Sequence, residues 1–169
     1  MKTSVLIMGC AVMVAGCAHT AAGPSVAKAQ MKDLSGGVVG EATVRSRSAG
    51  LRVLLQAQGL TPGPHGVHVH AVGKCEAPGF TGAGGHWNPT GKQHGKDNPA
   101  GMHQGDLPNM TVGSDGRGSI EFMIDGASLA ELLDADGAAV VVHATADDYK
   151  TDPSGNSGGR IACGVLTAS

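Results

Sequence analysis

Apolar and polar residues alternate along much of the chain, which is the period-2 pattern of a β-strand. The alternation is clear from Val38 and again from Leu51, and shorter apolar runs follow at intervals towards the end of the chain. The strands expected from this pattern cover residues 38–45, 51–56, 65–70, 111–113, 119–124, 138–143 and 161–166. One helical turn is expected over 128–133, where Ser128 can act as the N-cap. The pattern predicts an all-β fold, an antiparallel sandwich or barrel.

Two loops are longer than such a domain needs, at residues 73–109 and 147–160. Loops of this length in a compact domain are usually functional. The 28 glycines fit a chain rich in turns, and an aromatic content of 2% leaves the core to aliphatic residues and methionine. A formal net charge of −2 and the lack of any Lys/Arg run provide no basic surface for nucleic acid, which we therefore exclude as a partner.

The N-terminus has the features of a secretory signal, because one positive charge is followed by a short apolar run and small residues. Residues 14–17, Val-Ala-Gly-Cys, resemble a bacterial lipobox, in which Cys17 becomes the lipidated first residue of the mature chain. The alternative is a plain secretory signal that is cut near residue 21 or 22. We expect a signal over 1–17, a tether over 18–36 and a folded domain over 37–169. The protein is then exported to the periplasm or cell envelope, and only this lipid anchors it to a membrane.

Export also bears on the cysteines. Cys10 and Cys17 belong to the signal, which leaves Cys75 and Cys163 in the folded domain. Two cysteines in an exported domain most simply form one disulfide. In the chain-entropy model, closing so long a loop stabilises the fold by about 4–5 kcal/mol. The alternative is a pair of free thiols.

The first long loop contains four potential metal ligands, His86, His94, His103 and Asp106, in a segment with almost no apolar residues. Such a segment has no core of its own, but a metal ion can order it. Three imidazoles and one carboxylate make a tetrahedral nitrogen and oxygen shell that suits zinc. The alternative is a loop whose histidines are only solvated.

Three further histidines strengthen the case for a metal site. His68 and His70 lie two apart on an expected strand, so their side chains share one face and can bind one ion together. His143 ends the apolar run 138–143, which reads as a buried strand. If His68 and His70 are considered without the other candidate ligands, the alternative is a polar strand face on which both histidines are solvated.

Taken together, these motifs resemble those of the copper,zinc superoxide dismutases of the bacterial exported type, over residues 38–166. The matching motifs are His68-Val69-His70, Gly85-His86-Trp87-Asn88-Pro89, His94, His103 to Asp106-Leu107, Val142-His143-Ala144-Thr145-Ala146-Asp147-Asp148 and Gly159-Arg160-Ile161-Ala162-Cys163-Gly164. The resemblance implies a Greek-key, immunoglobulin-like β-sandwich or barrel. It also implies dismutation of superoxide to dioxygen and hydrogen peroxide by a redox-cycling copper ion.

The resemblance further implies one copper and one zinc ion per subunit. Copper would be held by His68, His70, His86 and His143. Zinc would be held by His86, His94, His103 and Asp106, so that His86 bridges the two metals. Imidazoles suit both ions, and zinc, which has no redox chemistry, would order the loop.

The remaining roles follow from the same resemblance. Arg160 would attract and orient the superoxide anion, and His86 would carry a proton to the product. Asp147 would join a copper-side and a zinc-side imidazole and fix their rings. Cys75 and Cys163 match the disulfide of the family.

A homodimer is the assembly to consider, although only four residues separate His70 from Cys75, in a loop that helps to build the dimer interface in other members. Two rival functions remain open. One is an exported copper- or zinc-binding protein without turnover, and the other is a structural lipoprotein that binds metal incidentally.

Overall fold

The computed structural model describes residues 23–169. The expected signal over 1–17, with the lipidation site Cys17, lies outside the described residues, as does the start of the expected tether. Within the described part of the chain, no helix is both long and apolar enough to span a membrane.

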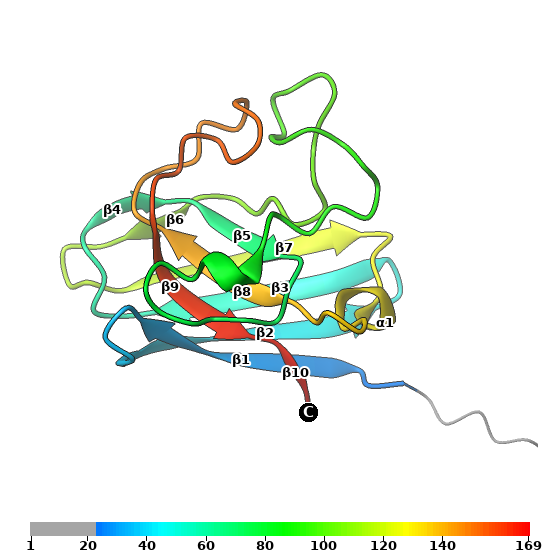
Figure 1. Cartoon of the computed structure of the whole chain (residues 1–169), viewed down its shortest axis with the longest axis horizontal. Coiled ribbons are helices and arrows are strands. Elements are labelled where there is room, and N and C mark those ends of the chain that lie inside the picture. The colour runs from blue at the N-terminus through cyan, green and yellow to red at the C-terminus, as the bar shows by residue number, and fades with distance from the viewer. Residues whose placement is uncertain (1–22) are drawn as a thin grey trace, which may run out of the picture.

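Residues 23–169 form one ten-stranded sheet whose strand pairs are antiparallel (Figure 1). The strands are β1 (Val26–Asp33), β2 (Val38–Arg47), β3 (Gly50–Ala57), β4 (Gly63–His65), β5 (Val67–His70), β6 (Met110–Val112), β7 (Gly118–Asp125), β8 (Ala139–His143), β9 (Arg160–Val165) and β10 (Thr167–Ala168). The helical elements are η1 (Thr81–Ala83), a 3-10 turn, and α1 (Leu129–Leu132). Ser128 caps α1 in a capping box with Glu131. The prediction of an all-β antiparallel fold is confirmed.

The sheet curls into a barrel-like shape. Its strand order is β4-β6-β7-β3-β2-β1-β9-β8-β5, and β10 pairs with β1. The two ends of this order, β4 and β5, are separated in sequence by Gly66 alone, which brings the ends of the sheet together. Strands distant in sequence are neighbours, as where β3 pairs with β7 and β1 with β9, in the manner of Greek-key connections.

The tether expected over residues 18–36 is wrong from Val26 onwards, because Val26–Asp33 is strand β1. This strand pairs with β2 over most of its length and with β9 at its end. Ala27, Ala29 and Met31 are buried, and the polar residues between them are exposed. Alanine, lysine and glutamine have weak strand preferences, so the alternation is faint in the sequence and the packing partners decide the structure. The folded domain therefore begins before residue 37.

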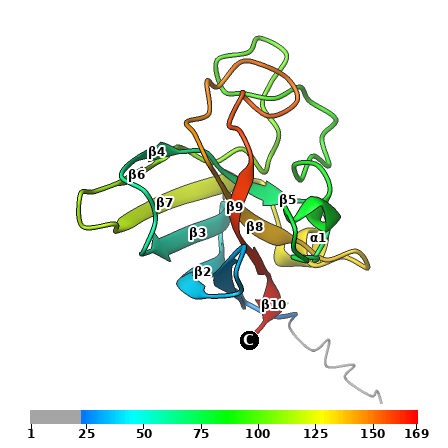
Figure 2. The same cartoon turned by 60° about the vertical axis from the view of Figure 1, so that its left-hand side comes forward.

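Aliphatic side chains fill the interior, as the composition predicts, with Val44, Val53 and Leu55 among the residues that are fully buried. Strands β5 and β8 are buried along their whole length. The two long connections, from β5 to β6 and from β8 to β9, rise side by side over one end of the sheet in both views (Figures 1 and 2). The long loops that flank the predicted ligands thus lie together in space.

Candidate metal centre

Four imidazoles converge on one point at this end of the barrel. His68 and His70 come from β5, His143 from the end of β8, and His86 from the first long loop, and one nitrogen of each lies within 4.8 Å of the others. The four atoms are His68 Nδ1, His70 Nε2, His86 Nε2 and His143 Nε2, all buried and without a hydrogen-bond partner among the described residues. Leaving buried polar atoms unpaired costs free energy. Four imidazole lone pairs facing one point fit the needs of a copper ion.

The first long loop is held against β5 by backbone hydrogen bonds, which is how His86 reaches the strand histidines. The Trp87 N–H donates to Val69 O at 2.8 Å, and the Val69 N–H donates to Gly105 O at 2.8 Å. The Leu107 N–H donates to Val67 O at 3.2 Å. Residue 105 must be glycine, because a Cβ there would overlap the backbone of Val69.

In the first group of histidines, the ring nitrogen that does not face the common point has a hydrogen-bond partner of its own. His70 Nδ1 lies 2.9 Å from Gly84 O, and His143 Nδ1 lies 3.2 Å from Gly158 O. A ring N–H that donates to a carbonyl leaves the lone pair on the opposite nitrogen. These contacts therefore select the tautomer that can bind a metal ion.

A second group of potential ligands surrounds one carboxylate oxygen, Asp106 Oδ1. His86 Nδ1 lies 2.8 Å from it, His94 Nδ1 3.0 Å and His103 Nδ1 3.2 Å. Three imidazoles and one carboxylate match a zinc site. The compact set of potential ligand atoms here comes from His68, His86, His94 and Asp106, and it does not include His103. The Nδ1 of His68 belongs to the first group and its Nε2 contacts Asp147, so His103, which lies next to Asp106 Oδ1, fits better as the fourth member.

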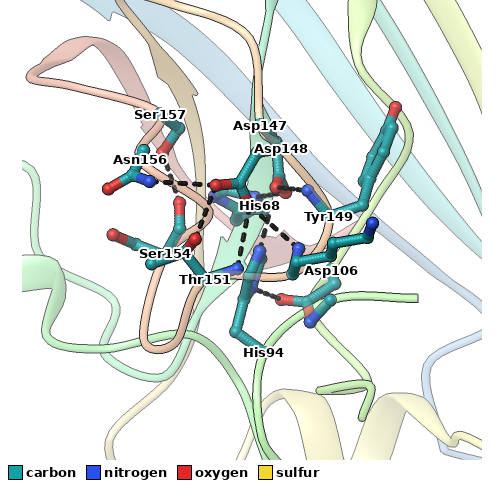
Figure 3. A network of polar contacts seen from close by, with 12 residues as sticks. His68, His94, Asp106, Asp147, Asp148, Tyr149, Thr151, Ser154, Asn156 and Ser157 are labelled. Atoms are coloured by element: carbon teal, nitrogen blue, oxygen red, sulfur yellow. Dashed lines mark hydrogen bonds and ion pairs between the residues drawn. The ribbon is translucent and has the colours of Figure 1, made fainter. Parts of the chain in front are cut away.

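The ring of His86 belongs to both groups, with Nδ1 in the second and Nε2 in the first. Asp147 makes a second link between them. Its Oδ2 accepts from His68 Nε2 at 2.7 Å and its Oδ1 accepts from His94 Nε2 at 2.9 Å (Figure 3). The side chain of Asp147 is fully buried, so both contacts are shielded from water.

Burial controls the charge of the first group. It lowers the pKa of His70 to about 2, of His143 to about 3 and of His86 to about 4. These rings are neutral at neutral pH, and their lone pairs are available. For Asp106 and Asp147, burial favours the neutral acid, but hydrogen bonds from the histidines outweigh it and hold the pKa of each carboxyl below its usual range.

His94 behaves differently from the first group. Burial alone would lower its pKa, but its hydrogen bonds to Asp106 and Asp147 outweigh burial and raise the pKa to about 9. The space between the two carboxylates therefore favours a positive charge, which a metal ion would also supply.

A cavity of about 440 Å³ gives access to the first group, and its wall includes His70, His86, His143 and Arg160. The Arg160 guanidinium is fixed by two hydrogen bonds, from Nη1 to Phe80 O at 2.7 Å and from Nη2 to Gly84 O at 2.6 Å. A cation thus stands at the wall of the cavity in a defined orientation.

The predicted disulfide is confirmed, because Cys75 and Cys163 are bonded with their Cα atoms 5.6 Å apart. The alternative of two free thiols is wrong. The bond joins the first long loop to β9, which begins with Arg160. A disulfide in the folded domain agrees with an exported protein.

Sequence reasoning gave no role to three residues that hold this site. His65 is buried, and its Nδ1 lies 2.7 Å from His143 O. Asn109 contacts the main chain of Asp147. Tyr149 contacts the carboxylate of Asp147 through its backbone N–H. The histidine next to the His68 motif was a visible signal, whereas nothing in the sequence pairs Asn109 with Asp147.

The family model for copper/zinc superoxide dismutase (SODC) matches residues 38–166. The chain belongs to this family. A superoxide dismutase-like protein of Bacillus subtilis is 43% identical over 81% of this chain and 74% of its own length. The Cu-Zn superoxide dismutase of Deinococcus radiodurans is 38% identical over 98% of this chain and 96% of its own. The crystal structure of a double mutant of a SOD-like protein from Bacillus subtilis has a TM-score of 0.79 and 43% identity, and covers 83% of this chain and 97% of that one.

Membership of the copper/zinc superoxide dismutase family confirms the predicted enzyme class, an oxidoreductase that acts on superoxide. It confirms copper and zinc as the predicted cofactors, for which the two histidine groups supply suitable atoms. The bacterial sources of the relatives agree with the predicted bacterial type.

Proposed function

We propose that this superoxide dismutase converts two superoxide anions and two protons into dioxygen and hydrogen peroxide at the cavity beside Arg160. The observation that carries the proposal is the convergence of four buried, unpartnered ring nitrogens. Three of the four histidines, His70, His86 and His143, lie in the wall of that cavity. A structural protein would have no reason to leave four such atoms unsatisfied, because each costs free energy.

We assign the two histidine groups to the two metals. The copper ligands are His68, His70, His86 and His143. The zinc ligands are His86, His94, His103 and Asp106. Copper when bound supplies one-electron exchange with superoxide, and zinc supplies a fixed charge without redox chemistry. The contacts of His86 with Asp106 on one side and its free Nε2 on the other support its place as the bridge.

Two residues of the cavity wall would act on the substrate. Arg160 carries a fixed positive charge, and a local positive potential draws a small anion into a pocket even when the net charge of the protein is negative. His86 has Nδ1 held on the Asp106 side, so Nε2 is the atom at which it can take up a proton and release it to the peroxide product. Asp147 would keep the rings of His68 and His94 in place.

Stopped-flow measurement of superoxide decay tests this proposal, using the chain from about residue 18 loaded with copper and zinc. We expect rapid decay that is lost in His143→Ala, which removes one nitrogen of the copper set. A protein that holds one copper and one zinc per chain but does not accelerate the decay would instead be a metal-binding relative without turnover. Weak, substoichiometric metal binding would indicate a structural lipoprotein.

We also propose that the mature protein carries a lipid on Cys17 and lies in the periplasm or cell envelope. The lipobox-like residues 14–17 and the disulfide support this location. Mass spectrometry of the mature N-terminus tests it, and an unmodified start beyond Cys17 would contradict the lipid anchor. The proposed assembly is a homodimer, on the family resemblance, and sedimentation velocity of the lipid-free protein measures it directly.

A further inference from the structure

Tyr149 lies where the two long loops meet, two residues after Asp147. Its backbone N–H donates to Asp147 Oδ1 at 2.6 Å, the same oxygen that accepts from His94 Nε2 (Figure 3). Its carbonyl oxygen accepts from the Asp97 N–H at 3.0 Å, so the main chain of Tyr149 contacts the segment that follows His94. One residue therefore binds the carboxylate and the opposite loop at once.

The side chain of Tyr149 makes separate contacts. Its Oη accepts from the Asn109 N–H at 2.8 Å, and the Lys96 ammonium lies 4.4 Å from the centre of its ring. The ring also lines a small, mainly apolar cavity of about 60 Å³ together with Leu107 and Phe122. These contacts fix the ring against the barrel and against the first long loop.

Asn109 closes the arrangement, because its side chain holds the main chain of Asp147. Its Nδ2 donates to Asp147 O at 2.9 Å, and its Oδ1 accepts from the Asp147 N–H at 2.8 Å. Tyr149 Oη in turn accepts from the backbone of Asn109. Asp147, Tyr149 and Asn109 thus form a closed cycle of hydrogen bonds around the carboxylate.

The backbone of Tyr149 has φ +63°, in the left-handed region that non-glycine residues seldom adopt. Such a conformation persists only where surrounding contacts hold it. At residue 95, which is a glycine, a Cβ would overlap the Tyr149 carbonyl, so the two loops approach each other closely here. In this left-handed turn the Tyr149 N–H contacts Asp147 Oδ1 while its carbonyl contacts the Asp97 N–H and its phenol the Asn109 N–H.

We propose that Tyr149 is a positioning residue that holds the Asp147 carboxylate in place between His68 and His94. Among the described residues its side chain accepts a hydrogen bond from the Asn109 N–H and contacts Lys96, neither of which is a proposed metal ligand, and it acts through Asp147. This inference rests on the proposed assignment of His94 to zinc and of His68 to copper. The phenol contacts the backbone of Asn109, and the side chain of Asn109 holds the main chain of Asp147. Because Asp147 reaches the rings of both His68 and His94, the phenol of Tyr149 influences how long the protein retains zinc.

The test uses the release of zinc from the zinc-loaded protein to a chromophoric chelator, which requires no catalytic turnover. Tyr149→Phe removes one hydroxyl and leaves the Asn109 N–H without its acceptor. Thr151→Val is the matched control, since it removes one hydroxyl from the same loop, where Thr151 Oγ1 donates to Asp148 Oδ2 at 2.7 Å. Outer contacts of metal ligands commonly change metal affinity by about tenfold or more. We expect zinc release to be about tenfold faster in Tyr149→Phe and nearly unchanged in Thr151→Val.

A double-mutant cycle distinguishes positioning from general loosening of the loop. If Tyr149 acts through Asp147, Tyr149→Phe has almost no further effect on zinc release in an Asp147→Ala background. The inference is overturned if Tyr149→Phe releases zinc at the unaltered rate, or if it accelerates release equally with and without Asp147.

The proposed function can fail separately from this inference. A protein that retains zinc but does not dismutate superoxide overturns the proposed function, and the comparison of Tyr149→Phe with Thr151→Val still decides the role of Tyr149. A protein that takes up neither metal overturns both.

Discussion

The backbone of Gly155 lies directly against the carboxylate of Asp147. A Cβ at residue 155 would overlap Asp147 Oδ1 and would lie 2.6 Å from His94 Nε2. Both residues belong to the same loop. Because Gly155 has no side chain, the carboxylate of Asp147 can reach the histidines. We therefore expect Gly155→Ala to displace Asp147 and to lower zinc affinity by about 10- to 100-fold, measured by chelator competition.

Gly91→Ala is the control for this substitution. Gly91 has φ +62° and Gly155 has φ +63°, so both substitutions strain the backbone in the same way. No atom lies within 4 Å of the Cβ position at Gly91. Equal losses of zinc affinity in the two variants would show that backbone strain, and not displacement of Asp147, is the cause.

Arg160 is expected to set the rate at which the anion arrives. Arg160→Met removes the fixed charge from the cavity wall, so the rate of superoxide decay should fall several-fold and its dependence on ionic strength should flatten, while copper stays bound. Stopped-flow decay at several salt concentrations measures both effects. Arg45→Met on β2 makes the same change of charge at an exposed site and should leave the rate unaltered. Equal rates in Arg160→Met and the unaltered protein would remove Arg160 from the mechanism.

The buried histidines predict that the metal-free protein loses stability in acid. The folded-state pKa values of His70, His143 and His86, about 2, 3 and 4, lie well below the usual value of 6.5. Below pH 6.5 the unfolded chain binds protons at these residues that the folded protein does not bind. The contribution of these histidines to the free energy of unfolding is therefore complete above pH 6.5. It decreases as the pH is lowered below 6.5, by at most about 1.4 kcal/mol per pH unit for each histidine.

Urea unfolding of the metal-free protein between pH 8 and about pH 5 checks this expectation. His94 changes the free energy of unfolding with pH in the opposite direction, because its pKa is raised to about 9. Its contribution is complete below pH 6.5 and is lost as the pH rises through 9. The free energy of unfolding should therefore be greatest near neutral pH, and a constant value from pH 6.5 to pH 5 would contradict the prediction.

Strand β1 is expected to be essential to the fold. It buries Ala27, Ala29 and Met31 and pairs with both β2 and β9. A chain that begins at residue 37 lacks these contacts and should show no cooperative thermal unfolding by circular dichroism. A chain that begins at residue 23 is the control and should unfold cooperatively. Cooperative unfolding of the shorter chain would show that β1 is dispensable.

The sequence predicted most strands and singled out every histidine of the two candidate ligand groups, because alternation and imidazoles are properties of the residues themselves. It missed β1, where small and polar residues adopt a strand only because β2 and β9 lie on either side. It also could not show that the carbonyl oxygens of Phe80 and Gly84 hold Arg160, because every residue has a carbonyl. The left-handed turn at Tyr149 depends on contacts with Asp97 and Asn109, which lie far away in sequence.

The loop that carries His86 and Asp106 also covers an edge of the sheet. Strand β5 pairs with β8 on one side, and on the other its Val67 and Val69 bond to the backbone of Trp87, Gly105 and Leu107. An uncovered strand edge is a template for pairing with another chain and hence for aggregation. The ordered loop therefore leaves this edge of β5 no free backbone groups at Val67 O and Val69 for pairing with a strand of another chain. Conditions that loosen this loop should expose the edge of β5, so retention of the metal ions and solubility would be linked in one segment of the chain.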